Sequence, residues 1–205
     1  MGRPLWRVVR AGSITSTQDV ARDLEIGSVV VADHQTAGRG RLDREWEALP
    51  DTALLVSFVL APNPLLSLAA GVAAAEACGP EVRLKWPNDL LLGGRKLGGI
   101  LVEARARKAV CGIGINLSWA PEGAARIGLP RDELLERMID SMGRWCAAPP
   151  ADMLVRWREL SDTLGRRVRV SLAGRLVEGV ARDIGPGGEL LVGDETIIAG
   201  SVTHL

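Results

Sequence analysis

The loop expected at 34–46 alternates glycine with arginine after residue 37. Gly38-Arg39-Gly40-Arg41 lets the backbone turn tightly and present N–H groups to an anion, while two guanidinium groups add charge and forked donors. The spacing and the Lys-Ser/Thr ending of a Walker loop are missing. On its residues alone, the segment is either an anion-binding loop or a flexible, solvated basic loop.

Two expected strands lack side chains on one face. Alternation along residues 109–117 gives one face made of Val110, Gly112, Gly114 and Asn116. The preceding strand contains Gly98-Gly99, and alternation places Lys96 on the same face as Gly98. Glycine inside a strand usually means that a ligand or another backbone comes close. We therefore expect a flat slot with Lys96 at one edge and Asn116 at its end; the alternative is a bulge or a tight crossing of the chain.

Lysines and an acidic turn surround this slot. Lys85 and Lys96 bracket a hairpin, and either could hold a carboxylate or a phosphoryl oxygen, although a single lysine is usually solvent-facing. Asp89, next to Asn88, could bind Mg²⁺ beside phosphates or could be a turn residue. Trp46 could stack on a purine, wall a pocket or belong to the core.

The elements that must position these residues alternate between strands and helices. Strands are expected at 5–10, 28–32, 52–60, 83–86, 89–92, 96–103 and 109–117, and helices at 65–78, 131–146 and 151–162, with a short helix opened by Ser16. Gly93-Gly94 predicts a hairpin turn. This order favours an α+β fold with a mixed, largely antiparallel sheet and packed helices.

From Gly165 onwards, short strands alternate with glycine-rich turns. Strands are expected at 167–172, 176–183, 189–192 and 196–198. This pattern predicts a small all-β barrel. We expect a domain at 1–162 that contains the site and a second domain at 163–205.

Charge and cysteine content narrow the class of protein. The chain has 25 Lys plus Arg and 25 Asp plus Glu, so no overall field steers it towards nucleic acid or a membrane. Cys78, Cys111 and Cys146 lack the spacing of a zinc site or a disulfide framework. No segment qualifies as a signal peptide or a membrane span. These features predict a cytoplasmic protein without a membrane partner.

Four motifs, in this order, resemble the active site of biotin protein ligases. They are His34–Arg41 with Trp46, Lys85–Asp89, Arg95–Ile100 and Gly112–Asn116; in addition, Ser16–Gln18 resembles that family's Ser-Thr-Asn segment. The resemblance covers most of residues 14–117, and the C-terminal strands match the family's SH3-like domain. It implies a fold like that of class II aminoacyl-tRNA synthetases.

The resemblance also implies a reaction and its participants. The carboxylate of biotin would attack the α-phosphate of ATP to give biotinyl-5′-AMP, and a lysine of a biotin carboxyl carrier protein would then attack the acyl phosphate. The implied catalytic residues are Lys96, Arg39 and Arg41. Biotin would contact Ser16, Thr17, Gln18, Gln35, Gly38, Arg39, Lys96, Gly98, Gly99, Gly112 and Gly114. ATP would contact Arg41, Trp46, Lys85, Asn88 and Asn116, and Asp89 would hold Mg²⁺.

Two departures from the family pattern qualify the resemblance. The family loop usually continues with Arg-Gly where this chain has Leu42-Asp43, which is expected to alter how the loop retains the adenylate. The chain begins almost at the first expected strand, which predicts no N-terminal helix-turn-helix and no DNA binding.

A homodimer is possible. The alternatives are a non-catalytic biotin or biotinyl-adenylate sensor and a lipoate or octanoate ligase, whose usual Arg-Arg-Ser-Gly-Gly-Gly stretch is absent.

Overall fold

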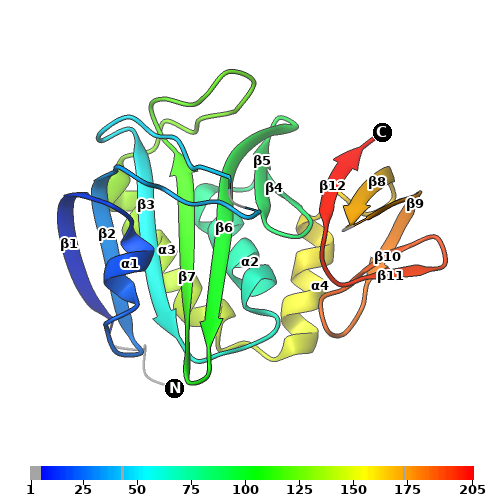
Figure 1. Cartoon of the computed structure of the whole chain (residues 1–205), viewed down its shortest axis with the longest axis horizontal. Coiled ribbons are helices and arrows are strands. Elements are labelled where there is room, and N and C mark those ends of the chain that lie inside the picture. The colour runs from blue at the N-terminus through cyan, green and yellow to red at the C-terminus, as the bar shows by residue number, and fades with distance from the viewer. Residues whose placement is uncertain (1–5, 43, 173) are drawn as a thin grey trace.

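A mixed sheet of seven strands forms the larger part of the molecule (Figure 1). The computed structural model describes residues 6–42, 44–172 and 174–205. The strands are β1 (Arg7–Ile14), β2 (Ser28–Gln35), β3 (Ala53–Leu60), β4 (Val82–Lys85), β5 (Asp89–Leu92), β6 (Arg95–Arg105) and β7 (Lys108–Asn116), in the spatial order β1-β2-β3-β7-β6-β5-β4. Only the β1–β2 pair among these strands is parallel. The prediction of a largely antiparallel α+β fold is confirmed.

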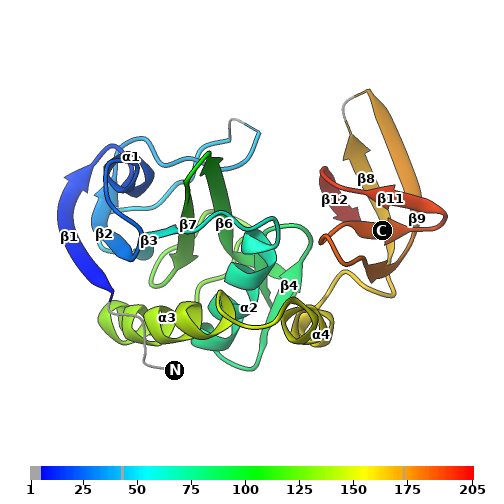
Figure 2. The ribbon, with the colours of Figure 1, turned by 90° about the horizontal axis from the view of Figure 1, so that it is seen from below.

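Helices cover the two faces of this sheet unequally. The helices are α1 (Thr17–Ala21), α2 (Leu66–Cys78), α3 (Arg131–Trp145) and α4 (Pro150–Leu160). Figure 2 shows α2, α3 and α4 in one layer and the short α1 on the opposite side of the sheet. Helix α2 is almost entirely apolar and buried, apart from Ser67 and Glu76, as expected for a helix sandwiched between a sheet and other helices. The face that carries α1 is thus left with room for a site.

The second sheet has five antiparallel strands in the order β11-β10-β9-β8-β12. They are β8 (Arg167–Leu172), β9 (Arg175–Ile184), β10 (Leu190–Val192), β11 (Glu195–Ile197) and β12 (Ser201–His204). The sequence did not predict β12, because Ser201-Val202-Thr203-His204 is short and mostly polar; it pairs with β8 all the same. The sheet agrees with an SH3-like domain, and the exact boundary near Asp162 stays a prediction.

Other element boundaries differ from expectation by a few residues. Strand β2 continues to Gln35, into the segment expected to be a loop, because it pairs with β1 as far as Ile14. The expected first strand began at Leu5, which lies outside the described residues, and β1 extends four residues beyond Arg10. Within the described ranges, no helix is long and apolar enough to cross a membrane.

Candidate active site

A cavity of about 360 Å³ opens on the sheet face that carries α1. Its walls come from α1, the loop after β2, the turn between β4 and β5, strands β6 and β7, and β12 of the second sheet. The predicted site residues that line it are Ser16, Thr17, Gln18, Gln35, Arg39, Arg41, Trp46, Lys85, Asn88, Asp89, Lys96, Gly99, Gly112 and Gly114. Three predicted residues do not line it: Gly38, Gly98 and Asn116.

A network of buried polar groups forms the α1 end of the cavity. Ser16 caps α1 by accepting a hydrogen bond from the Gln18 N–H. The Oε1 atom of Gln35 accepts from the Thr17 N–H at 2.7 Å and from the Thr17 hydroxyl at 2.9 Å. Gln18 donates through Nε2 to the Leu101 carbonyl at 3.1 Å. Its Oε1 is buried and has no hydrogen-bond partner among the described residues, and Gln18 lines the cavity, so an N–H donor of a ligand that reaches this atom would satisfy it.

The glycines of β7 allow two large side chains to approach the sheet. A Cβ atom at Gly112 would lie 3.1 Å from Gln18 Nε2, and one at Gly114 would lie 2.6 Å from Trp46 Cε2. The indole of Trp46 therefore occupies the part of the slot above Gly114, which was expected to be the floor for a ligand. Both Gly114 and Trp46 line the cavity, so the indole covers part of the glycine floor, and the contact of biotin with Gly114 stays a prediction.

A β-bulge in β6 changes which residues share a face with Lys96. The pairing with β5 shifts between Leu90–Gly98 and Leu91–Lys96, which leaves Leu97 as the extra residue with its side chain fully buried. A Cβ at Gly98 would point at Ile115, on the core side, whereas Gly99 faces Lys96 and Trp46. The expectation that Gly98 shares the face of Lys96 is wrong, because the bulge inverts the alternation; Gly99 takes that place.

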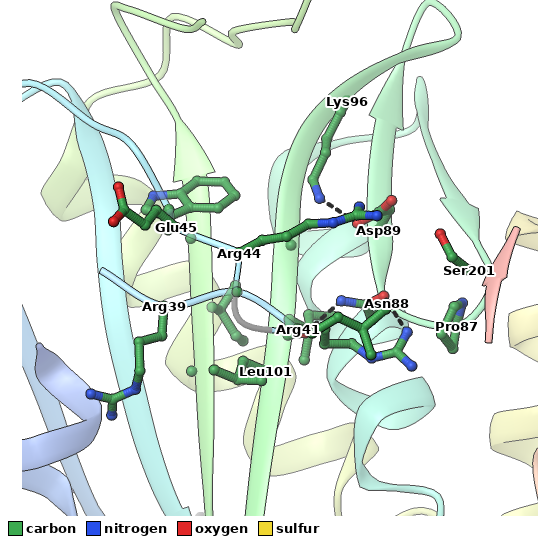
Figure 3. A pocket seen from close by; sticks show the side chains of 18 of the residues that line it. Arg39, Arg41, Arg44, Glu45, Pro87, Asn88, Asp89, Lys96, Leu101 and Ser201 are labelled. Atoms are coloured by element: carbon green, nitrogen blue, oxygen red, sulfur yellow. Dashed lines mark hydrogen bonds and ion pairs between the residues drawn. The ribbon is translucent and has the colours of Figure 1, made fainter. Parts of the chain in front are cut away.

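Lys96 and Asp89 form an ion pair over the cavity, as Figure 3 shows. Lys96 Nζ lies 2.6 Å from Asp89 Oδ1, and the Lys96 side chain keeps 47% of its exposure. The sequence placed Lys96 at the slot and Asp89 at the start of the hairpin, and the two side chains do meet. The ammonium is thus held at the rim, where an incoming anion can reach it.

The two arginines of the basic loop point in different directions (Figure 3). Arg41 Nη1 donates to Asn88 Oδ1 at 3.1 Å and to the Gly200 carbonyl at 3.4 Å. Arg39 Nη2 lies 2.9 Å from Asp19 Oδ1 of α1, and its hydrogen bond holds the pKa of that carboxyl below its usual value. The resemblance implied that both arginines take part in catalysis, and the structure places them at different parts of the rim.

Burial lowers the pKa of the Arg41 guanidinium from its ordinary value. The nearby carboxylate of Asp89 raises this pKa, and the positive charge of Arg44 lowers it again. A half-buried cation that lies beside a second arginine would be stabilised by an anion between them. This part of the cavity is therefore suited to a phosphate group.

Gly38 and Asn116 have structural roles in the described chain. A Cβ at Gly38 would lie 2.6 Å from the Trp46 carbonyl oxygen, so glycine allows the two backbone segments to cross, and Gly38 lies at a neighbouring depression instead of the main cavity. Asn116 is buried and donates through Nδ2 to the Ala125 carbonyl at 2.9 Å, which anchors the loop after β7. The predicted contact between Asn116 and the nucleotide is not supported by this position.

Sequence reasoning missed several residues that line the cavity. Arg44 crosses the opening towards Asp89 (Figure 3), and its position three residues after Arg41 in the basic loop was a usable signal. Gly200 and Ser201 reach the cavity from the second sheet, and nothing in their sequence indicated it. Leu42 lines the cavity with an unusual positive φ of 55°, and Asp43 lies outside the described residues.

No cluster of three potential metal-ligating side chains (His, Cys, Asp or Glu) occurs in the described part of the chain.

Known proteins share both this sequence pattern and this architecture. The model of the biotin/lipoate A/B protein ligase family matches residues 10–119, more than half of the chain. A biotin–[acetyl-CoA-carboxylase] ligase of Mycobacterium tuberculosis is 36% identical, with 87% of this chain and 79% of the relative aligned. The bifunctional ligase/repressor BirA of Escherichia coli is 32% identical, over 86% of this chain and 64% of that longer protein.

A solved structure gives the same result for the fold. The biotin protein ligase from Aquifex aeolicus in complex with biotin and ATP superposes with a TM-score of 0.85 at 25% identity, and the alignment covers 97% of this chain and 98% of that one. This coverage includes the second sheet as well as the seven-stranded one. Together, the family match, the aligned relatives and the shared architecture show that the chain belongs to the biotin/lipoate A/B protein ligase family, as one of its biotin protein ligases.

Proposed function

We propose that this chain uses ATP to activate biotin as biotinyl-5′-AMP and transfers the biotinyl group to a lysine of a biotin carboxyl carrier protein. One observation carries the proposal: a single cavity joins the free acceptor of Gln18 to the Lys96 ammonium and to the arginine-rich rim. A ureido head group has N–H donors, its acid chain ends in a carboxylate, and ATP brings phosphates. The three parts of the cavity fit these three chemical groups in order.

The biotin head would lie at the α1 end. Its N–H donors would meet Gln18 Oε1, and Thr17 and Gln35, which bond to each other, would keep that pocket in shape. The floor at Gly112 leaves the ring close to the sheet. The valeryl chain would then run past the Trp46 indole towards Lys96.

The nucleotide would lie at the end formed by the β4–β5 turn and β12. Arg41 and Arg44 would bind the phosphates, with Lys85 and Asn88 on the same wall. Lys96 would bridge the biotin carboxylate and the α-phosphoryl oxygens. A carboxylate oxygen bonds to the α-phosphorus as the bond to pyrophosphate breaks, so the protein supplies positioning and positive charge rather than a nucleophile.

The residues present also fit a magnesium ion. Mg²⁺ commonly takes one or two carboxylates together with phosphate oxygens and water, and Asp89 offers one carboxylate at the phosphate end. When bound there, the ion would neutralise polyphosphate charge. Asp89 would exchange its partner Lys96 for the ion, which would free the ammonium for the reacting oxygens.

Transfer requires the carrier lysine to reach the acyl carbon, with AMP as the leaving group. The cavity is open at the rim, where Lys96 stays exposed, so an amine from outside has a path. We place the protein in the cytoplasm, because its three cysteines are free, as suits a reducing compartment. A homodimer stays a prediction, which light scattering would test.

Incubation with biotin, ATP, Mg²⁺ and a carrier domain, followed by intact-mass measurement, tests the proposed function. The carrier is expected to gain one biotinyl group. Tight biotin binding without any gain would favour the non-catalytic sensor. A gain only with lipoate or octanoate would point to the related acyl ligases and contradict the proposal.

Replacing Gln18 by leucine is expected to weaken biotin binding by about 10- to 100-fold, because a buried acceptor for the head group is lost. The KM for ATP should stay within a factor of about two, since Gln18 lies at the other end of the cavity. Calorimetric titration with biotin measures the first effect, and steady-state pyrophosphate release measures the second. An unchanged Kd for biotin would remove Gln18 from the head-group pocket.

A further inference from the structure

The turn between β4 and β5 is held by hydrogen bonds to residues that follow α4 in the chain. The Trp86 backbone N–H donates to Thr163 Oγ1 at 3.0 Å, and its indole Nε1 donates to the Gly188 carbonyl at 3.0 Å. The Trp86 side chain is buried. Its neighbours along the chain are Lys85 and the Pro87-Asn88 pair, all of which line the cavity. The wall at this end of the cavity is thus anchored to residues outside the seven-stranded sheet.

Thr163 connects this wall to the strand on the other side of the opening. Its hydroxyl accepts from Trp86, which leaves its own proton for His204 Nε2 at 3.3 Å. His204 belongs to β12, three residues after Ser201, which lines the cavity. One buried link between the two walls therefore passes through the Thr163 hydroxyl, beside the bridge that Arg41 makes at the rim between Asn88 and Gly200.

The groups around His204 favour this direction of the hydrogen bonds. Burial lowers the pKa of the His204 imidazole, Lys85 and Arg166 lower it further, and Asp162 raises it. His204 Nδ1 lies 3.6 Å from Asp162 Oδ2, so the neutral ring can keep its proton on Nδ1 and accept from Thr163 at Nε2. Asp162 is itself fixed, because its N–H donates to the Leu84 carbonyl at 2.8 Å, next to Lys85.

We propose that Thr163 is a positioning residue for the nucleotide end of the cavity, acting through Trp86 on the wall that carries Lys85 and Asn88, and through His204 on the wall formed by β12. This inference rests on the proposed function, which assigns that end of the cavity to ATP. Thr163 does not line the cavity. Its effect should therefore appear in nucleotide binding and spare the biotin end, where the α1 network makes no contact with it.

Replacing Thr163 by valine keeps a β-branched side chain of similar size and removes the acceptor for the Trp86 N–H. A buried donor without a partner is unfavourable, so the turn is expected to shift and the KM for ATP to rise about 10-fold. The KM for biotin should stay within about two-fold of the wild-type value, because sites that are far apart and share no partner respond independently. Thr163→Ser restores the hydroxyl and should restore the KM for ATP.

The experiment is steady-state pyrophosphate release with ATP and biotin varied in turn, on the full chain. Thr196→Val, the same chemical change at an exposed position of β11, is the matched control and should leave both KM values unchanged. His204→Leu removes the acceptor on the other side of Thr163 and is expected to raise the KM for ATP about 3-fold; it serves as the second variant if Thr163→Val does not fold. Circular dichroism checks the fold of each variant.

Lys85→Ala separates a failure of this inference from a failure of the assignment beneath it. The role of Thr163 alone would be overturned if Lys85→Ala raises the KM for ATP while folded Thr163→Val leaves both KM values unchanged. If Thr163→Val does not fold, unchanged KM values in His204→Leu have the same meaning. Equal rises in both KM values, or no rescue by serine, would also overturn it. If Lys85→Ala leaves the KM for ATP unchanged, the nucleotide assignment of this wall fails, and the inference fails with it.

Discussion

Replacing Lys96 by alanine is expected to slow the formation of biotinyl-5′-AMP by about 10²–10³-fold, the usual loss when one preorganised charge partner of a transition state is removed. Lys96 is the cation at the rim of the cavity where carboxylate and α-phosphate oxygens would converge. Its removal also leaves the Asp89 carboxylate without its ion-pair partner, beside an incoming anion. Pyrophosphate release in a single turnover, with both substrates saturating, measures this rate.

Arg95→Ala provides the control for Lys96. Arg95 is the exposed preceding residue and does not line the cavity, so its loss removes a charge without touching the proposed reaction centre. It should keep the wild-type rate. A near-normal rate of pyrophosphate release in Lys96→Ala, with the circular dichroism spectrum preserved, would remove Lys96 from the mechanism.

Replacing Gly114 by alanine is expected to lower kcat/KM for adenylate formation by about 10- to 100-fold, from roughly 1–3 kcal/mol of overpacking. The added Cβ would lie 2.6 Å from Cε2 of the Trp46 indole, a rigid ring that cannot yield by a rotamer change of its far end. The Trp46 backbone is itself held by a hydrogen bond from its N–H to the Gly38 carbonyl. The whole indole must therefore move into the cavity.

Gly12→Ala is the matched control for this substitution. Gly12 also lies in a strand of the same sheet, and a Cβ there would meet no atom within 4 Å. Gly99→Ala should give a kcat/KM between those of Gly114→Ala and Gly12→Ala, because its Cβ would be at an ordinary contact distance of 3.5 Å from Trp46. Wild-type kinetics in Gly114→Ala would show that the close approach of Trp46 to the sheet is not needed for the reaction.

Local sequence patterns predicted most of the fold. Alternation and turn residues located the strands of the large sheet, and the alanine-rich segment at 65–78 predicted the helix that packs on it, which the structure has at Leu66–Cys78. Strand β12 was missed because a short polar segment becomes a strand only when β8 offers it a partner. The extension of β2 to Gln35 depends in the same way on pairing with β1. Such pairings join residues distant in sequence, so local patterns cannot reveal them.

The sequence predicted which residues form the candidate site better than it predicted how they are arranged. Glycines at 112 and 114 correctly indicated a close approach, but the sequence could not say that the first occupant is Trp46. The bulge at Leu97 depends on the register between β5 and β6, and it alone decides that Gly99 and not Gly98 faces Lys96. The opposite directions of Arg39 and Arg41 follow from acidic and amide partners on separate elements.

The central claim is that one cavity holds the biotin head at Gln18, the phosphates at Arg41 and the reacting atoms at Lys96. A crystal structure of this chain with a non-hydrolysable analogue of biotinyl-5′-AMP tests it most directly. The account predicts a ureido N–H within hydrogen-bond distance of Gln18 Oε1 and the α-phosphoryl group in contact with Lys96 Nζ. An analogue bound in the reverse direction, or outside this cavity, would contradict it.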